Sequence, residues 1–302
     1  MANAIDTGSK ARASRRRAGV LAAVAAALAV GLIAYGAWVR ASSSGLGCPD
    51  WPLCHGTIAP DFEKATYIEW GHRIFAGLVI AIAALALLFA HRSRDIDRGL
   101  FQVLLAAVAV FLLQAALGGI VVLTELNNLA VMLHLTIAMT ALSLLVLASV
   151  RVLASAEGGM PDSALVTAVF VTGAAVILLG SSLVATNVWA SCQGFPLCPT
   201  TTQAGPTALN VVHRAAGGVL LVLLAWMAAQ LTRRDAPVLL KAATHGALVA
   251  LLLQGVVGYL GVRWVFPEWV RVLHLGLAAV IWAGLSVDWA ALVLRRRGQW
   301  RG

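Results

Sequence analysis

Long apolar runs separated by short polar segments dominate the chain. Eight of these runs are long enough to cross roughly 30 Å of hydrocarbon as helices that rise about 1.5 Å per residue. They lie at residues 18–39, 68–90, 100–123, 130–150, 164–186, 209–231, 239–262 and 270–294. The pattern therefore predicts an all-α integral membrane protein with eight transmembrane helices.

The composition agrees with a membrane protein. Of the 302 residues, 60% are hydrophobic and 12% are charged, whereas a soluble domain carries about 25% charged residues. Intrinsic disorder is excluded for the same reason. The basic stretch before the first run resembles the start of a signal peptide, but the run is longer than the roughly 7–15 apolar residues of such a peptide. We therefore interpret it as a membrane span.

The positive charges predict how the helices are oriented. Sixteen of the 22 Lys and Arg residues lie in the two terminal tails and in the loops on the same side as the tails. Cytoplasmic loops carry such an excess, so both termini are expected in the cytoplasm and the loops 40–67 and 187–208 outside it. The net charge of +9 then needs no nucleic-acid partner, and the lipid bilayer is the expected environment.

The second half of the chain repeats the first. The segment Cys48–Cys54 corresponds to Cys192–Cys198, at an offset of 144 residues. Three further features recur in the same order at offsets of 141, 140 and 140: His72-Arg73 with His213-Arg214, Gln114 with Gln254, and His134 with His274. Each repeat contains four spans, so both enter the membrane in the same direction. The repeat predicts two tandem four-helix bundles related by a pseudo-two-fold axis along the membrane normal.

This repeat divides the chain into five parts. The expected parts are a cytoplasmic basic tail (1–17), an N-terminal bundle (18–152), a cytoplasmic linker (153–163), a C-terminal bundle (164–294) and a cytoplasmic tail (295–302).

Four histidines recur in both repeats near the same ends of the even-numbered spans. They are His72, His134, His213 and His274. Ionisable groups inside a membrane are costly and are usually functional, and two imidazoles from facing helices can hold a heme iron at both axial positions. Zinc or copper also accepts imidazole, and a lone intramembrane histidine often makes only a helix contact. The pattern favours two heme sites near the extracytoplasmic side.

The remaining histidines have no histidine at the corresponding position. His55, His91 and His245 are interpreted as loop or interface residues.

Two further pairs of polar residues lie next to these sites. Arg73 and Arg214 could pair with heme propionates or extend to the membrane interface. Gln114 and Gln254 could line the pockets, but hydrogen bonding between helices is favoured.

One ionisable residue breaks the repeat. Glu69 lies three residues before His72, on the same helical face, whereas the second repeat has Asn210 at this position. A carboxylate beside one heme can transfer protons during an oxidation, which electron transfer alone does not require. The alternative is an interfacial glutamate without a catalytic role.

The four cysteines lie in the two outer loops, where disulfides persist. The spacing favours the disulfides Cys48–Cys54 and Cys192–Cys198. A zinc site shared by all four cysteines would need closer pairs, and a redox-active role for Cys48 and Cys54 stays open.

Taken together, these motifs resemble the heme A synthase family, in its bacterial type with two extracytoplasmic cysteine pairs. The resemblance rests on GLGCPDWPLC at 45–54, EWGHR at 69–73, VHR at 212–214 and the Leu-His-Leu segments around His134 and His274, and it covers nearly the whole chain. It implies an oxidoreductase that hydroxylates the C8 methyl group of heme o twice, after which loss of water gives the formyl group of heme a. The heme a would serve the assembly of terminal oxidases.

The resemblance also implies a role for each half. His213 and His274 would hold heme b, heme o would bind between His72 and His134, and Glu69 would be essential for catalysis. Heme o would be delivered by a heme o synthase, and a membrane or peripheral partner would transfer electrons. The expected location is the bacterial cell membrane. A di-heme electron-transfer cytochrome and a heme carrier or exporter are the alternatives.

Overall fold

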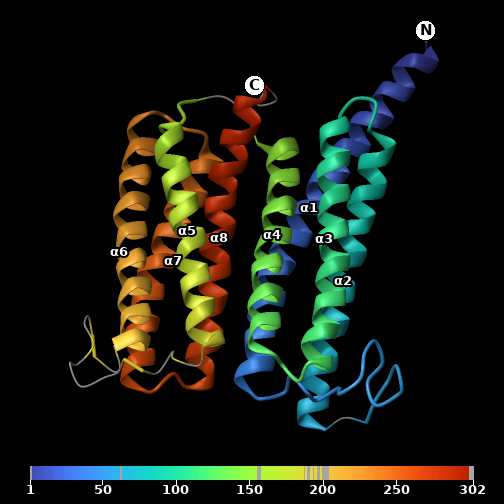
Figure 1. The fold of residues 1–302 in the computed structure, drawn as a ribbon. Helices are drawn as coiled ribbons and strands as arrows, with labels where there is room; N and C mark the ends of the chain where they lie inside the picture. The colour runs from blue at the N-terminus through green and yellow to red at the C-terminus, as the bar shows by residue number, and fades with distance from the viewer. Residues whose placement is uncertain are drawn as a thin grey trace.

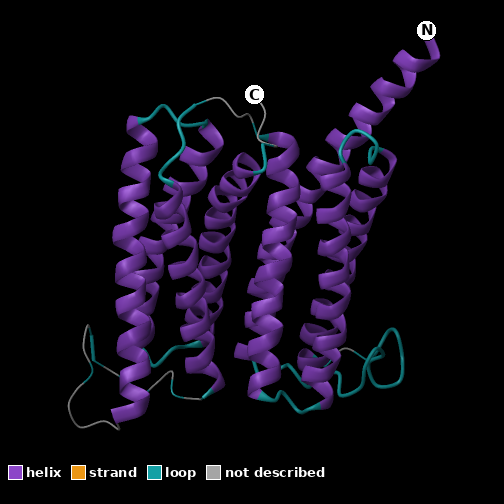
Figure 2. Cartoon of the chain, turned by 45° about the horizontal axis from the view of Figure 1, so that its top comes forward, coloured by secondary structure: helices purple, strands orange, loops and turns teal. Residues whose placement is uncertain are grey.

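The computed structural model describes residues 2–61, 63–154, 158–186, 188, 191, 192, 194, 195, 198 and 204–298, with the side chains of 2–7 and 204–206 left out. Within these residues it contains eight α-helices and no strand (Figure 2). All eight are long and apolar enough to cross a membrane. The predicted all-α membrane fold is therefore confirmed. The helices are α1 (Ala2–Ala41), α2 (Lys64–Arg92), α3 (Arg98–Leu123), α4 (Asn128–Leu153), α5 (Ser163–Ala185), α6 (Ala204–Arg233), α7 (Val238–Arg263) and α8 (Glu268–Arg296).

Most helices extend a few residues beyond the apolar runs that predict them. The largest difference is in α1, which begins at Ala2, so that the expected tail at 1–17 is helical from Ala2 onward. This segment is rich in Ala and Arg, which are strong helix formers. An apolar run marks only the part of a helix that suits hydrocarbon, whereas helix propensity continues past it.

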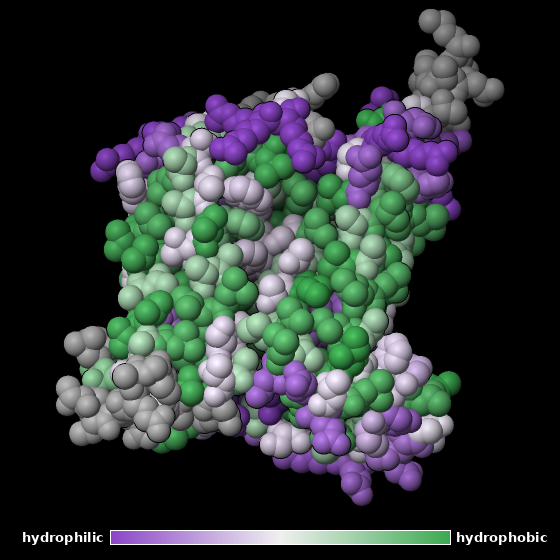
Figure 3. All heavy atoms as spheres, in the orientation of Figure 1, coloured by the Kyte–Doolittle hydropathy of each residue, from purple (hydrophilic) through white to green (hydrophobic). Residues whose placement is uncertain are grey.

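The helices form two groups that lie side by side, α1–α4 and α5–α8, which we call the first half and the second half (Figure 1). Both termini lie at one end of the molecule, the terminal end, and the helix ends that flank the two long loops lie at the other, the loop end. On the face shown in Figure 3, apolar residues form a belt between these ends, and polar residues gather beyond it. The halves meet through α1 with α8, α4 with α8 and α4 with α5, an arrangement compatible with the predicted pseudo-two-fold axis.

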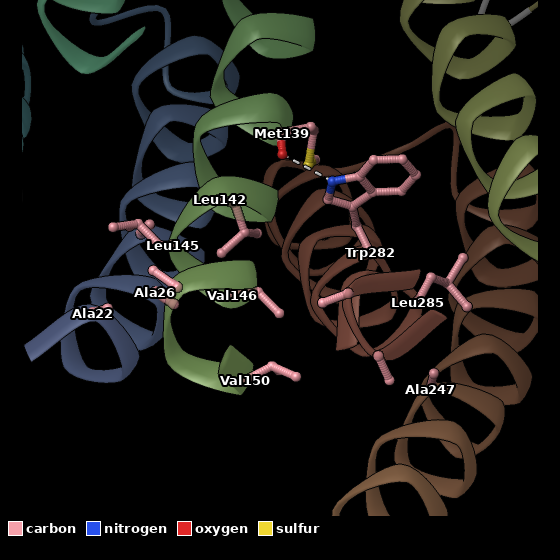
Figure 4. Close-up of a cluster of buried hydrophobic side chains, with 14 of the residues drawn as sticks. Ala22, Ala26, Met139, Leu142, Leu145, Val146, Val150, Ala247, Trp282 and Leu285 are labelled. Atoms are coloured by element: carbon pink, nitrogen blue, oxygen red, sulfur yellow. Dashed lines mark hydrogen bonds between the residues drawn. The ribbon is translucent and has the colours of Figure 1, made fainter. Parts of the chain in front are cut away.

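A core of buried side chains joins the two halves (Figure 4). Ala22 and Ala26 of α1 lie close to Leu142 and Leu145 of α4, and all four are at most 8% exposed. Across the junction, the indole nitrogen of Trp282 on α8 donates a hydrogen bond of 2.9 Å to the carbonyl oxygen of Met139 on α4. Nearby, the hydroxyl groups of Ser143 and Ser286 lie 2.9 Å apart. Small residues and interhelical hydrogen bonds stabilise helix contacts in membranes, so this core fixes the two halves relative to each other.

An ionic cluster links three elements of the first half at the terminal end. Asp97 caps α3 by accepting a hydrogen bond of 3.0 Å from the backbone nitrogen of Leu100, and it forms ion pairs with Arg15 of α1 at 2.8 Å and Arg151 of α4 at 2.7 Å. Burial raises the pKa of the Asp97 carboxyl, but the hydrogen bonds from Arg151 and Arg15 outweigh it and hold the pKa below its usual value. The charged form of Asp97 therefore stabilises this end of the bundle.

Candidate functional site

The four repeated histidines lie on the even-numbered helices, close to the loop end. His72 is eight residues after the start of α2, and His134 and His274 are each six residues after the starts of α4 and α8. His213 occupies the corresponding turn of α6. His72 lies close enough to His134 to interact with it electrostatically, and His274 lies close enough to His213 to do the same. The structure thus brings together one pair of histidines in each half.

Each histidine ring packs against a glycine of the preceding odd-numbered helix. A Cβ atom added at Gly36 of α1 would lie 3.2 Å from Cε1 of His72, and one at Gly180 of α5 would lie 3.0 Å from Cε1 of His213. The corresponding distances are 3.3 Å for Gly118 and His134, and 3.6 Å for Gly258 and His274. Gly36 and Gly180 are 144 residues apart and Gly118 and Gly258 are 140 apart, so both halves build this contact in the same way.

These pairs fit heme iron better than a tetrahedral metal. The Nδ1 atoms of all four histidines are buried and have no hydrogen-bond partner among the described residues. Leaving a buried polar group without a partner costs roughly 1–3 kcal/mol. Among the described residues, no three His, Cys, Asp or Glu side chains are placed to hold a metal ion together, whereas zinc sites use three or four protein ligands. Two imidazoles in each half, each resting on a glycine that leaves room for it, match the axial ligation of a heme.

Glu69 lies beneath the long loop of the first half at the loop end. We call this loop and its counterpart in the second half the outer loops, after the side of the membrane predicted for them. It is 6% exposed, and its Oε1 atom accepts a hydrogen bond of 3.0 Å from Nε of Arg73. At the corresponding position of the second half, Asn210 is 4% exposed and donates hydrogen bonds to the carbonyl oxygen of Val188 and the hydroxyl group of Ser191, both at 3.0 Å. Both side chains face their outer loops, but only the first half has an acid there.

The two arginines hold the outer loops. Nη1 of Arg73 donates to the carbonyl oxygens of Asp50 and Leu53, at 2.8 and 2.7 Å, and Nη2 donates to that of Cys48 at 2.9 Å. In the second half, Nη2 of Arg214 donates to the carbonyl oxygen of Cys192 at 3.1 Å. The structure therefore gives both arginines contacts to their loops, and pairing with heme propionates stays a prediction.

Both predicted disulfides are present, and they exclude the zinc site considered for the four cysteines. Cys48 is bonded to Cys54, and Cys192 is bonded to Cys198. In the first loop, the backbone N–H groups of Gly56 and His55 donate to the carboxylate of Asp50 at 2.8 and 2.6 Å, and these hydrogen bonds lower the pKa of Asp50. The loop over Glu69 is therefore held by the disulfide, by Asp50 and by Arg73.

Gln114 makes the expected interhelical hydrogen bond. Its Nε2 atom donates to the backbone carbonyl oxygen of His134 at 2.7 Å, so it links α3 to the turn that carries this histidine.

The other three histidines lie away from the two pairs. His55 belongs to the outer loop, where Nε2 contacts the carbonyl oxygen of Gly47 at 2.9 Å. His91 is next to the last residue of α2, and His245 lies in the second turn of α7.

Sequence reasoning missed Gly36 and Gly180, although the repeat would have aligned them. It also missed Asp288 of α8, a carboxyl group that is 2% exposed within an apolar run. Thr244 of α7 donates a hydrogen bond of 2.9 Å to its Oδ2 atom, and Oδ1 has no partner in the part of the chain that the structure describes. A lone acid inside an apolar helix was the signal for Asp288.

The fold and the site define a class: eight-helix membrane proteins with two paired-histidine sites, one of which has an acid beside it. The family model for COX15-CtaA, described as cytochrome oxidase assembly protein, matches residues 19–64 and 60–286 of the chain. The chain belongs to this family.

Relatives are consistent with this assignment. The heme A synthase of Symbiobacterium thermophilum is 31% identical over 273 residues, which cover 84% of this chain and 88% of that protein. The heme A synthase of Halalkalibacterium halodurans is 32% identical over 203 residues, covering 63% of this chain and 67% of that protein. A third, from Bacillus pumilus, is 39% identical over 121 residues, 39% of this chain and 38% of that protein.

Proposed function

We propose that the chain is a heme A synthase, an oxidoreductase that converts the C8 methyl group of heme o to the formyl group of heme a. Membership in the family and the heme A synthases among the relatives support this reaction. The structural observation that carries the proposal is the difference between the halves: buried Glu69 accompanies His72, whereas Asn210 accompanies His213.

The two halves have different tasks in this proposal. His72 and His134 bind heme o as substrate, and His213 and His274 bind heme b as a resident cofactor. Heme b, when bound, supplies one-electron chemistry. The hydrogen bonds and apolar contacts between the halves keep the two sites at a fixed separation during turnover.

In this proposal Glu69 is the general acid–base residue at the substrate. Arg73 holds its Oε1 atom at 3.0 Å, so proton exchange takes place at Oε2. The position three residues before His72 places the carboxyl group one helical turn from the axial ligand, on the same face of α2. General acid–base catalysis by a positioned carboxyl group contributes about 10²–10⁴-fold to a rate.

The outer loop of the first half covers this site. Arg73 ties Glu69 to the carbonyl oxygens of Cys48, Asp50 and Leu53. The loop therefore limits the access of water to the carboxyl group from the loop end, which strengthens electrostatic interactions around it.

The proposal also includes location and partners. The distribution of Lys and Arg supports cytoplasmic termini and heme sites near the extracytoplasmic side of a bacterial cell membrane. A heme o synthase delivers heme o, and a membrane or peripheral protein exchanges electrons with the chain.

The test compares the two corresponding side chains. The native chain, Glu69→Gln and Asn210→Asp are each expressed with a heme o synthase, and their pigments are extracted. Glu69→Gln should retain heme o but form heme a at least about 100-fold more slowly, whereas Asn210→Asp should still form heme a. Normal heme a formation by Glu69→Gln would refute the role of Glu69, and absence of heme a from the native chain would refute the proposed reaction.

A further inference from the structure

Tyr35 of α1 covers one face of the His72 ring. The two rings are stacked, with centroids 5.7 Å apart and an interplanar angle of 11°. The next residue, Gly36, packs against Cε1 of the same imidazole. Two consecutive residues of α1 thus lie against His72. Tyr35 stacks on the imidazole ring, and Gly36 leaves room for the ring because it has no side chain.

Among the described residues, the second half has no aromatic side chain at the corresponding position. Gly36 and Gly180 occupy the same place against their histidines, so the residue before each glycine can be compared directly: Tyr35 corresponds to Leu179. The stacked phenol is therefore specific to the half that also carries Glu69.

A second exchange accompanies the first. A Cβ atom at Gly71, directly before His72, would lie 2.5 Å from the hydroxyl oxygen of Tyr35. In the second half, the residue directly before His213 is Val212. The first half thus combines a large residue on α1 with glycine on α2, and the second half combines Leu179 with Val212. A side chain on α2 at position 71 would require Tyr35 to move, so the two residues form one fitted contact.

Other aromatic side chains hold the Tyr35 ring in place. It makes edge-to-face contacts with Trp38 at 5.4 Å and with Phe75 at 6.3 Å between centroids. Trp38 is itself anchored to the second half, because its indole nitrogen donates a hydrogen bond of 2.8 Å to Oε1 of Glu268 on α8. Such aromatic pairs contribute beyond simple burial, so the orientation of Tyr35 is set by three helices.

We propose that Tyr35 is a positioning residue that fixes the ring plane of His72 in the first half, through the stacked contact and its fit over Gly71. This inference rests on the proposed function, because it concerns the ligand of the substrate heme. His213 has no such aromatic neighbour at the corresponding position, so the two halves hold equivalent ligands with unequal rigidity. The asymmetry of the site then extends from Glu69 to the axial ligand itself.

The experiment uses full-length protein purified from cells that make heme o. In a low-spin ferric heme with two imidazole ligands, the electron paramagnetic resonance g-values depend on the angle between the imidazole planes. His72→Ala identifies the signal of the first half by removing it, and the signal of the second half serves as an internal control for folding.

Tyr35→Leu, which introduces the side chain of the second half, should shift the first-half signal and leave the second-half signal unchanged. It should also reduce heme a formation by roughly tenfold or more, because misplacement by about 1 Å can cost about 100-fold. Tyr35→Phe keeps the ring and should keep the native signal. An unchanged first-half signal in Tyr35→Leu, or an equal shift in Tyr35→Phe, would overturn the proposal.

A second pair of variants tests the fit independently of Tyr35→Leu. Gly71→Ala should shift the first-half signal because its Cβ meets the Tyr35 hydroxyl, and Tyr35→Phe combined with Gly71→Ala should restore it, since the ring carbon Cζ is 3.5 Å away. No shift in Gly71→Ala, or no restoration in the double variant, would also overturn the proposal. If the native protein gave no first-half signal at all, the proposed function would fail instead.

Discussion

The glycines that pack against the histidines allow the same substitution to be compared at two positions of one site. In the second half, Gly180 and Gly258 contact the two histidines of the same pair, His213 and His274. A Cβ atom at Gly180 would lie 3.0 Å from the imidazole, whereas one at Gly258 would lie 3.6 Å away, at ordinary van der Waals distance. The same substitution should therefore weaken the site at Gly180 but not at Gly258.

Two terms set the magnitude. Replacing glycine by alanine inside a helix stabilises it by about 0.8–1 kcal/mol. At Gly180 the imidazole must also move by several tenths of an ångström, and overpacking of this kind costs about 1–3 kcal/mol. Gly180→Ala should then destabilise the site by up to about 2 kcal/mol, which weakens heme retention by up to about 30-fold. Gly258→Ala should be neutral or stabilising by up to about 1 kcal/mol.

The assay is the ratio of heme b to purified protein during dilution in detergent, together with the temperature of heme release. Gly180→Ala should lose heme b early, and Gly258→Ala should keep it as the native protein does. Equal losses from both variants, or no loss from Gly180→Ala, would refute the reasoning about the glycine contacts.

Three further predictions concern other parts of the chain. Asp97→Asn should lower the free energy of unfolding at pH 7 by about 2–3 kcal/mol, less than for a fully buried pair because the Arg15 side chain is 34% exposed. Since the folded-state pKa of Asp97 is lowered, the stability that Asp97 contributes is complete above its unfolded-state pKa and is lost as pH falls through its folded-state pKa. The melting temperatures of the native protein and the variant should therefore converge in acid. A difference that persists in acid would contradict the ionic account. Thiol labelling of the unreduced protein should modify none of the four cysteines, because both pairs are bonded; full labelling would contradict the disulfides. Asp288→Asn should leave the melting temperature nearly unchanged, because an amide oxygen can still accept the hydrogen bond from Thr244. Thr244→Val should destabilise the protein by about 1–3 kcal/mol, because it removes the hydrogen bond to Asp288. Equal stability of Thr244→Val and the native protein would show that this hydrogen bond contributes nothing.

The sequence predicted the fold because membrane spans are defined by local composition. Each helix needs an apolar run of sufficient length, and the eight runs match the eight helices α1–α8. The internal repeat also identified His72, His134, His213 and His274 without structural information. These features depend on the chain's own periodicity, and the repeat acts as a second copy against which each residue can be compared.

The closeness of approach between helices was beyond the reach of the sequence. The roles of Gly36 and Gly180 depend on how closely α1 approaches α2 and α5 approaches α6, and no pattern within a single helix reports that distance. The contacts of Arg73 could not be predicted for the same reason. Its position beside His72 suggested a propionate partner, whereas its contacts with Cys48, Asp50 and Leu53 depend on how the outer loop folds.

The central claim is that the two histidine pairs hold different hemes, one as substrate and one as cofactor. Its most direct test is the pigment content of the native protein purified from cells that also produce a heme o synthase. The account predicts heme b together with heme o, heme a or a hydroxylated intermediate in one preparation, with heme b lost in His213→Ala and the other pigments lost in His72→Ala. A preparation that contained heme b alone, or in which both variants lost the same pigment, would contradict it.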